Sequence, residues 1–250
     1  MHIAVFRFAA ELNDFLPRPQ RGKPIVYSFD WRASIKDMIE SLGIPHNQVS
    51  LLVVNGVSVD FEVIVQDGDR IDVYPTFDAV DLPGKVRLRP PLPRPLRFIL
   101  DIHLGRLAAY LRMMGFDTAY GPPWVDADFP DEDLAQVAHY QKRVLLTRDI
   151  GLLKRSIVTY GYWVRSTDRH ARLAEIVKHF DLKEDMKLFS RCMKCNGLLR
   201  PVDKADVLDR LKPGTAHTVD VFHQCEDCGK VFWKGSHVER MQGLIDEVLG

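Results

Sequence analysis

Acidic side chains follow short apolar runs at three places after residue 97. Asp101 follows the run "FIL", Asp149 follows "VLLT" after one arginine, and Asp168 follows "YWVRST". If these runs are parallel strands, their carboxyl ends meet at one edge of a sheet, where such sheets form ligand sites. Three further acidic residues open a helical pattern after a proline and are expected in the same layer: Asp131, Glu132 and Asp133.

Several carboxylates at one edge repel one another unless a cation or protons neutralise them. Oxygen ligands favour hard cations such as Mg²⁺ or Mn²⁺ over zinc. Two such ions roughly 4 Å apart can activate a water and stabilise the leaving oxygen of a phosphodiester. The sequence has no glycine-rich phosphate loop, no HExxH helix and no locally supported Ser-His-Asp arrangement. Metal-dependent phosphodiester hydrolysis is therefore the leading chemistry, with Asp101 and Asp149 as ligands of Mg²⁺ or Mn²⁺.

Helix capping is the alternative function of these acids. Aspartate is a preferred N-cap, and acidic residues stabilise the first helical turn, so Asp131, Asp149 and Asp168 could each only cap. Asp101 is harder to assign to capping, because it directly follows "FIL" and precedes the helical pattern by two residues. The repetition of acids at one edge is what favours a metal site.

Cations and a hydroxyl lie close to these acids in the sequence. Arg106 and Arg112 fall on the helix predicted after the first aspartate, and Thr147 and Arg148 immediately precede the second. Arginine can hold a phosphate with two hydrogen bonds, and a hydroxyl can bind water or substrate. We expect all four to bind substrate; the alternatives are ordinary helix-surface arginines and a strand threonine.

All four cysteines occur in two CxxC pairs. "CMKC" holds Cys192 and Cys195, and "CEDC" holds Cys225 and Cys228, with 29 residues between the pairs. Two intervening residues let a tight turn direct both sulfurs at one ion, and four thiolates complete a tetrahedral Zn²⁺ with no open position. Disulfides suit secreted chains, and a redox CxxC does not usually occur twice. The sequence predicts a structural zinc site.

Aromatic and basic residues alternate after the second cysteine pair, in "GKVFWKG". Bases stack on aromatic rings and cations meet phosphates, so Trp233 and Lys234 are candidates for binding single-stranded nucleic acid. Alternatively, Phe232 or Trp233 packs inside a small zinc-bound fold.

Strands and helices alternate between residues 97 and 181. The predicted strands are "RFILD", "FDTAY", "RVLLT" and "YWVRS", and helical patterns such as "DEDLAQVAHYQ" and "RHARLAEIVKHF" lie between or after them. This alternation implies parallel pairing with right-handed crossovers, hence an α/β domain. The net charge of zero indicates no class of partner by itself.

A separate α+β unit is predicted before this domain. "HIAVFRF" is a predicted strand, "SIKDMIESLGI" a helix, "VSLLVVNGVSV" a hairpin turning at Asn55-Gly56, and "DGDRIDVYP" a last strand. The proline- and arginine-rich "GKVRLRPPLPRPLR" then favours an extended linker.

The order of these elements resembles the β-grasp sulfur carriers and ubiquitin-like proteins, although the chain continues past Tyr74-Pro75 without their Gly-Gly end. The stretches "RFILDIHLGRLAAYLRMMGFDTAY" and "DEDLAQVAHYQKRVLLTRDIGLL", with the cysteine pairs, resemble the Mut7-C family of PIN-like RNases. That resemblance implies a PIN-type acidic site at Asp101, Asp131 and Asp149. Glu132 or Asp133 is the possible substitute for Asp131, and Asp168 is a fourth member. It also implies a zinc ribbon that grips substrate.

These observations predict a ubiquitin-like β-grasp domain over residues 1–80, a linker over 81–96, a PIN-like parallel α/β domain over 97–185 and a zinc ribbon over 186–250. We expect a cytoplasmic ribonuclease with structural Zn²⁺ and catalytic Mg²⁺ or Mn²⁺, acting on single-stranded or structured RNA. No membrane span is expected, and the β-grasp domain is a candidate docking site for a protein partner. The alternative is a non-catalytic nucleic-acid-binding or regulatory protein that uses the ribbon and the β-grasp domain.

Overall fold

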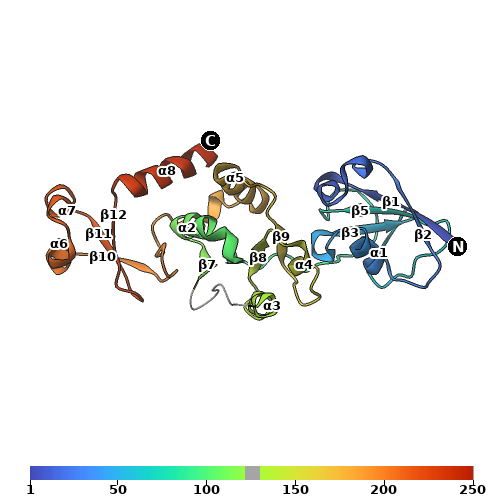
Figure 1. The fold of residues 1–250 in the computed structure, drawn as a ribbon, viewed down its shortest axis with the longest axis horizontal. Coiled ribbons are helices and arrows are strands. Elements are labelled where there is room, and N and C mark those ends of the chain that lie inside the picture. The colour runs from blue at the N-terminus through green and yellow to red at the C-terminus, as the bar shows by residue number, and fades with distance from the viewer. Residues whose placement is uncertain (122–129, 250) are drawn as a thin grey trace. The chain divides into compact units, whose positions relative to one another are not determined.

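The computed structural model describes residues 1–121 and 130–249 (Figure 1). The chain divides into two compact units. We call Met1–Leu92 with Asp149–Tyr162 the N-terminal unit, and Pro93–Arg148 with Trp163–Gly250 the C-terminal unit. Short 3-10 helices lie at Ala10–Phe15, Arg18–Gln20, His46–Gln48, Ile102–Leu104, Lys183–Asp185 and Leu208–Arg210.

A five-stranded sheet with the order β2-β1-β5-β3-β4 forms the body of the N-terminal unit. Its strands are β1 (His2–Phe8), β2 (Ile25–Phe29), β3 (Leu51–Val54), β4 (Val57–Val59) and β5 (Arg70–Tyr74). β1 and β5 pair in parallel at its centre. β3 and β4 form the predicted hairpin, in which Asn55 and Gly56 have φ angles of 50° and 87°, as a tight hairpin turn requires. The predicted β-grasp order of elements is confirmed.

Helix α1 (Ile35–Ser41) packs on this sheet and begins with a capping box. Asp37 N donates to Ser34 Oγ over 3.2 Å, and Ser34 N donates back to Asp37 Oδ2 over 3.4 Å. These bonds satisfy two backbone donors that a helix start leaves unpaired. Ile35, Met38 and Ile39 then point into the core.

Residues 149–162, which lie within the predicted nuclease segment, belong to the N-terminal unit. They contain helix α4 (Ile150–Leu153). Buried Asn47 donates its amide to Leu153 O over 2.6 Å and to Val158 O over 3.3 Å. Gln48 Nε2 donates to Gly161 O over 2.9 Å. Side chains of the β-grasp unit therefore hold the segment that begins at Asp149.

A four-stranded sheet has the order β7-β6-β8-β9. Its strands are β6 (Arg97–Leu100), β7 (Asp117–Ala119), β8 (Val144–Thr147) and β9 (Gly161–Trp163). β6 pairs in parallel with both β7 and β8. The helices α2 (Gly105–Met113), α3 (Asp131–Tyr140) and α5 (Arg169–Phe180) connect or follow these strands (Figure 1). The predicted parallel α/β domain is confirmed.

A second, antiparallel sheet of order β10-β11-β12 carries the cysteine pairs. Its strands are β10 (Leu199–Val202), β11 (Phe222–Cys225) and β12 (Val231–Trp233), and helices α6 (Lys204–Val207) and α7 (Pro213–Thr218) lie between β10 and β11. Helix α8 (Ser236–Leu249) follows and packs against α5 (Figure 1). The ribbon's last helix is therefore part of the α/β body.

A buried ion pair joins the starts of β7 and β8. Arg143, with 4% of its side chain exposed, donates two hydrogen bonds to the Asp117 carboxylate, at 2.7 and 3.2 Å, and one to Phe98 O at 3.2 Å. Asn196, from the first cysteine turn, donates to Asp117 Oδ1 over 2.8 Å. One network of hydrogen bonds thus joins these strands to the first cysteine turn.

Candidate active site and metal centre

Asp101 lies where β6 ends, and only 9% of it is exposed. Its Oδ1 accepts from His103 N over 2.9 Å, which caps the 3-10 helix that follows. Its Oδ2 accepts from Thr147 Oγ1 over 2.6 Å and from Arg148 N over 3.1 Å. The sequence favoured capping less for Asp101 than for the other acids, but Asp101 is an N-cap and is also fixed by the end of β8.

The side chains of Thr147 and Arg148 have different partners. Thr147 is fully buried and directs its hydroxyl at Asp101. The Arg148 guanidinium instead donates to the carbonyls of Val164, Arg165 and Ser166, at 2.9 to 3.2 Å. Arg148 therefore organises the connection from β9 to α5, and substrate binding by these two residues stays a prediction.

Asp149 and Asp168 both cap helices, as the capping alternative stated. Asp149 is exposed, and its Oδ1 accepts from Gly151 N over 2.7 Å at the start of α4. Exposed Asp168 accepts from His170 N at 2.9 Å and from Ala171 N at 3.0 Å at the start of α5. The N–H groups of Ala171 and His170 hold the pKa of Asp168 below its ordinary value.

The acidic cluster at the start of α3 is exposed and does not include the cap. Pro130 occupies the N-cap position, so the suggestion that Asp131 caps this helix is wrong. Asp131, Glu132 and Asp133 form the first turn, where the helix dipole favours negative charge. Among the described residues, only the four cysteines form a group of three or more metal-binding side chains close enough to share an ion.

The two arginines of α2 differ in their surroundings. Arg106 is exposed at the start of the helix. Arg112 is only 2% exposed and donates to the carbonyls of Thr118, Tyr120, Met193 and Lys194, at 2.7 to 3.2 Å. Arg112 is therefore not a helix-surface residue; it joins α2 and β7 to the first cysteine turn. Its contact with substrate stays a prediction.

The four cysteine sulfurs are arranged as a single metal site. They lie within 4.8 Å of one another, and all four cysteines are free. The Sγ atoms of Cys192 and Cys228 are 3.8 Å apart, and those of Cys195 and Cys225 are 3.4 Å apart. A tetrahedron with Zn–S bonds of about 2.3 Å has edges of about 3.8 Å. The four sulfurs therefore fit one zinc ion, which supports the predicted ligand set.

Each cysteine pair forms the same tight turn. Asn196 N donates to Cys192 O over 2.9 Å, and Gly229 N donates to Cys225 O over 3.0 Å. Asn196 and Gly229 have φ angles of 76° and 67°, which asparagine and glycine tolerate best. These turns bring both sulfurs of each pair to the same side.

The thiol pKa values respond to the same environment. Burial raises the pKa of the Cys192, Cys195 and Cys225 thiols. At Cys228 burial opposes ionisation, but the N–H of Lys230 and the neighbouring thiols bring the pKa to about 7. A divalent cation stabilises the thiolate form of all four and would offset the cost of burial.

The aromatic pair after the second cysteine turn has two environments. Phe232 is buried against Cys192 and Cys225, so the core-packing alternative is confirmed for this residue. Trp233 is half-buried, with its ring 6.2 Å from that of Phe222, and Lys234 is exposed. Trp233 and Lys234 keep accessible surface, and their binding of nucleic acid stays a prediction.

Sequence reasoning missed Asn196, Arg143 and Asn47, which connect distant parts of the chain. The turn at Asn196 could have been predicted, because asparagine directly after a CxxC is suited to a positive φ. Its amide, however, also accepts from Thr118 N over 2.9 Å, and nothing local predicts that contact.

Comparison with known families identifies both parts of the chain. Residues 96–245 match the model described as the Mut7-C RNAse domain, and residues 1–81 match the Mut7-C ubiquitin domain. No curated protein and no solved structure matches the chain. Among the described residues, no helix has the length and apolar composition that a membrane crossing requires. The chain belongs to the Mut7-C family, whose RNAse domain places it among nucleases, here with an N-terminal ubiquitin-like domain.

Proposed function

We propose that this protein is a Mg²⁺- or Mn²⁺-dependent ribonuclease that hydrolyses RNA phosphodiester bonds at a PIN-type acidic site centred on Asp101. The observation that carries the proposal is the Asp101 carboxylate, held in one orientation by Thr147 Oγ1, Arg148 N and His103 N at the carboxyl end of a parallel strand. Match to the Mut7-C RNAse domain supports it.

The hydrogen bonds to the Asp101 carboxylate leave one of its acceptor positions open for a cation. An ionised carboxylate has about four lone-pair positions, of which three are taken by the hydrogen bonds above, two of them on Oδ2. One position on Oδ1 thus remains for a metal. The other ligands we propose are Asp131 and Asp149, with Glu132 or Asp133 as a substitute for Asp131 and Asp168 as a fourth acid. A bound Mg²⁺ or Mn²⁺ would supply a more acidic water and neutralise charge on the phosphate.

The residues around Asp101 have positioning functions in this proposal. Thr147 and Arg148 N fix the carboxylate, so its ligand position does not need to be ordered when substrate arrives. Arg106 is the proposed substrate cation, because it is exposed and lies two residues after the 3-10 helix that Asp101 caps. The caps at Asp149 and Asp168 fix two more acids on the backbone.

The ribbon is proposed to hold structural zinc and to bind RNA. Four thiols that fit one tetrahedral ion support the zinc. Half-buried Trp233 and exposed Lys234 supply a ring and a cation for single-stranded RNA. Free cysteines arranged for a metal rather than for disulfides support a cytoplasmic location.

The direct test is cleavage of end-labelled single-stranded and structured RNAs by the zinc-loaded protein with added Mn²⁺. Asp101→Asn and Asp149→Asn should each lower the rate by at least about a hundredfold if metal chemistry is lost. Asp185→Asn, an exposed acid paired with Arg94, is the matched control and should keep the wild-type rate. Equal rates for all four proteins would refute the assignment.

A second candidate function is a non-catalytic RNA-binding or regulatory protein. It is favoured by one observation: Asp101, Asp149 and Asp168 all cap helices. Such a protein would bind RNA but show no cleavage and no Mn²⁺ binding that depends on Asp101. Within this alternative, the β-grasp unit is the proposed protein-docking module.

A further inference from the structure

We propose that the hollow between α2, α5 and α8 binds one nucleotide of single-stranded RNA, with its phosphate on Arg106, Arg169 and Arg240 and its base against Tyr110. The hollow has a volume of about 730 Å³. Pockets that bind small ligands measure about 300–1,000 Å³. The inference rests on the proposed function for the identity of the polyanion. It adds a nucleotide-binding site next to the proposed acidic site, with Arg106 common to both.

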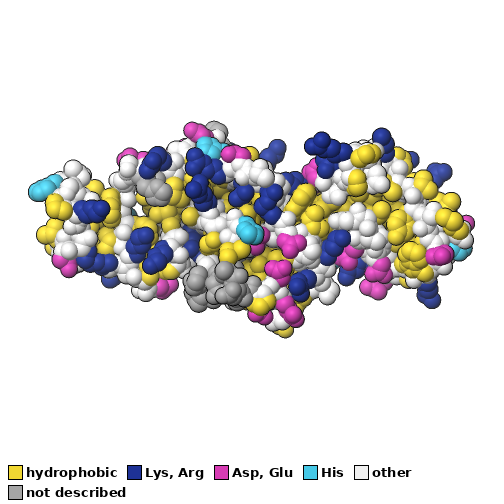
Figure 2. Space-filling model, in the orientation of Figure 1, with side chains coloured by type: hydrophobic (Ala, Val, Ile, Leu, Met, Phe, Trp, Pro, Cys, Tyr) yellow, Lys and Arg dark blue, Asp and Glu magenta, His cyan; other side chains and the backbone are white. Residues whose placement is uncertain are grey.

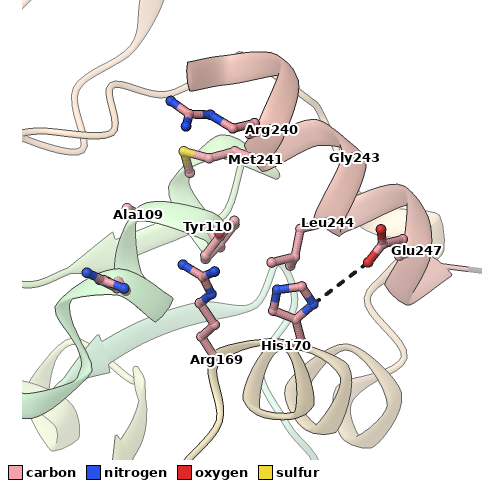
Figure 3. Close-up of a pocket in the computed structure, with 10 residues that line it drawn as sticks. Ala109, Tyr110, Arg169, His170, Arg240, Met241, Gly243, Leu244 and Glu247 are labelled. Carbon is pink, nitrogen blue, oxygen red and sulfur yellow. Dashed lines mark ion pairs between the residues drawn. The ribbon is translucent and has the colours of Figure 1, made fainter. Parts of the chain in front are cut away.

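The three arginines come from three different helices. Arg106 lies in the first turn of α2, Arg169 is the first residue of α5 and Arg240 lies in α8. Figure 3 shows Arg169 extending from α5 toward Tyr110, with Arg240 and Met241 above them on α8. Figure 2 shows Lys and Arg side chains gathered where these helices meet. The folding of α8 onto α5 therefore creates the basic hollow.

The positive charge in this hollow is only partly compensated within the protein. Among the described residues that line it, Glu247 is the one acid, and it faces His170 at 3.7 Å. Arg240 Nε donates to Ser236 O over 3.1 Å, which leaves its terminal nitrogens for a ligand. Neither Arg106 nor Arg169 forms an ion pair within the described part of the chain. Three guanidinium groups around one hollow favour an anion that can accept several hydrogen bonds, such as a phosphate.

The rest of the lining fits a nucleotide better than a bare anion. Half-buried Tyr110 presents a ring, and Met241 and Leu244 add apolar surface. Nucleic-acid bases stack on aromatic rings regardless of their identity, while arginines bind the backbone. A ring beside arginines is therefore the combination expected for single-stranded nucleic acid.

A second hollow continues the first toward the ribbon. The two share Ala109 and Met241. The second, of about 400 Å³, is lined by Lys194, Lys230 and Trp233 among others. One strand can thus occupy both hollows, with cations and a ring in each. This continuity favours an RNA strand over a free mononucleotide.

The test measures RNA binding separately from cleavage. A fluorescein-labelled single-stranded oligouridylate is titrated with zinc-loaded, full-length Asp101→Asn protein at several salt concentrations, without added Mg²⁺ or Mn²⁺. Arg169→Ala and Arg240→Ala should each weaken binding about tenfold and lower the slope of log affinity against log salt by about 0.7. Lys178→Ala removes one exposed charge from the opposite face of α5 and should change neither quantity.

A second pair of variants tests the base. Tyr110→Leu should weaken binding about tenfold without changing the salt slope, because stacking releases no counterions, while Tyr110→Phe should bind like the parent. Arginine variants that bind like Lys178→Ala, or a parent that binds no oligouridylate, would overturn the proposal. Equal affinity for inorganic polyphosphate, unaffected by Tyr110→Leu, would also overturn it. If the wild-type protein cleaves no RNA but the variants show these binding effects, the proposed nuclease activity is rejected and the proposed nucleotide site is retained.

Discussion

Replacement of Asp117 by asparagine tests the hydrogen-bond network that joins β6, β7 and β8 at the ends of these strands opposite Asp101. In the folded chain the Asp117 carboxylate, 20% exposed, accepts two hydrogen bonds from Arg143 and one from Asn196. Asp117→Asn keeps the shape of the side chain but removes its charge. It also replaces one carboxylate oxygen, which accepts hydrogen bonds, by an amide NH₂ group, which would face the N–H donors of Arg143 or Asn196. The guanidinium would then remain 4% exposed without its counterion.

Removal of one partner of a buried ion pair costs about 3–5 kcal/mol. Arg143 retains neutral acceptors in Phe98 O at 3.2 Å and Gln141 Oε1 at 2.7 Å, so the expected loss for Asp117→Asn lies near 3 kcal/mol, the lower end of that range. Asp185→Asn breaks the exposed pair with Arg94 and should cost about 0–1 kcal/mol.

The difference between wild type and Asp117→Asn should depend on pH. Burial alone would raise the pKa of Asp117, but the hydrogen bonds from Arg143 and Asn196 outweigh it and lower the pKa below 3.8. A lowered folded-state pKa contributes stability that is present above the unfolded pKa of about 3.9 and lost as pH falls through the folded value. The stability difference should therefore be full at pH 7 and shrink below about pH 4.

Urea unfolding at pH 7 and at intervals down to pH 3, followed by circular dichroism, measures both effects. Equal destabilisation by Asp117→Asn and Asp185→Asn at pH 7 would refute the reasoning about burial. A difference that stays constant as the solution becomes acidic would refute the assignment of the ion pair.

Three more perturbations test other contacts. Thr147→Val, which removes the hydroxyl donated to Asp101 over 2.6 Å, should lower the unfolding free energy by about 1.5–3 kcal/mol. Thr147→Ser should lose less; equal loss in both would show that the bond is unimportant. In Gly197→Ala the new Cβ would lie 2.3 Å from Asp227 Oδ2 and 2.9 Å from Cys225 Sγ, so zinc should be lost to a chelator at lower concentration than in wild type. Gly214→Ala, whose Cβ meets nothing within 4 Å, is its control, and identical zinc release by the two would contradict this geometry. Asn47→Ala leaves the carbonyls of Leu153 and Val158 without this donor, so amide hydrogen exchange in residues 149–162 should accelerate while that of β1 does not. Unchanged exchange there would indicate that the contact does not hold the segment.

Local patterns predicted most elements of the fold. The apolar run before Asp101 is β6, "VLLT" is β8, and Asn55-Gly56 turns the hairpin, because each pattern determines its own backbone. The clustering of the four cysteines could also be predicted, since CxxC spacing places two sulfurs together without help from distant residues.

Long-range contacts could not be predicted in this way. Nothing around Arg112 indicates that a helix arginine would be buried on carbonyls 81 and 82 residues away. No residue near Asn47 in the sequence indicates that its side chain would bond to Leu153 O. The sequence of α8 likewise does not indicate that this helix packs against α5. The basic hollow depends on that last contact, so only Arg106 of its three arginines was expected to bind substrate.

The most direct test of the acidic site is a crystal soaked in Mn²⁺ and measured at the manganese absorption edge. We predict an anomalous difference peak at ligand distance from Asp101 Oδ1, the oxygen with the open acceptor position, and its loss in Asp101→Asn crystals. Full Mn²⁺ occupancy elsewhere with no peak at Asp101, or an unchanged peak in Asp101→Asn, would contradict the proposed ribonuclease site.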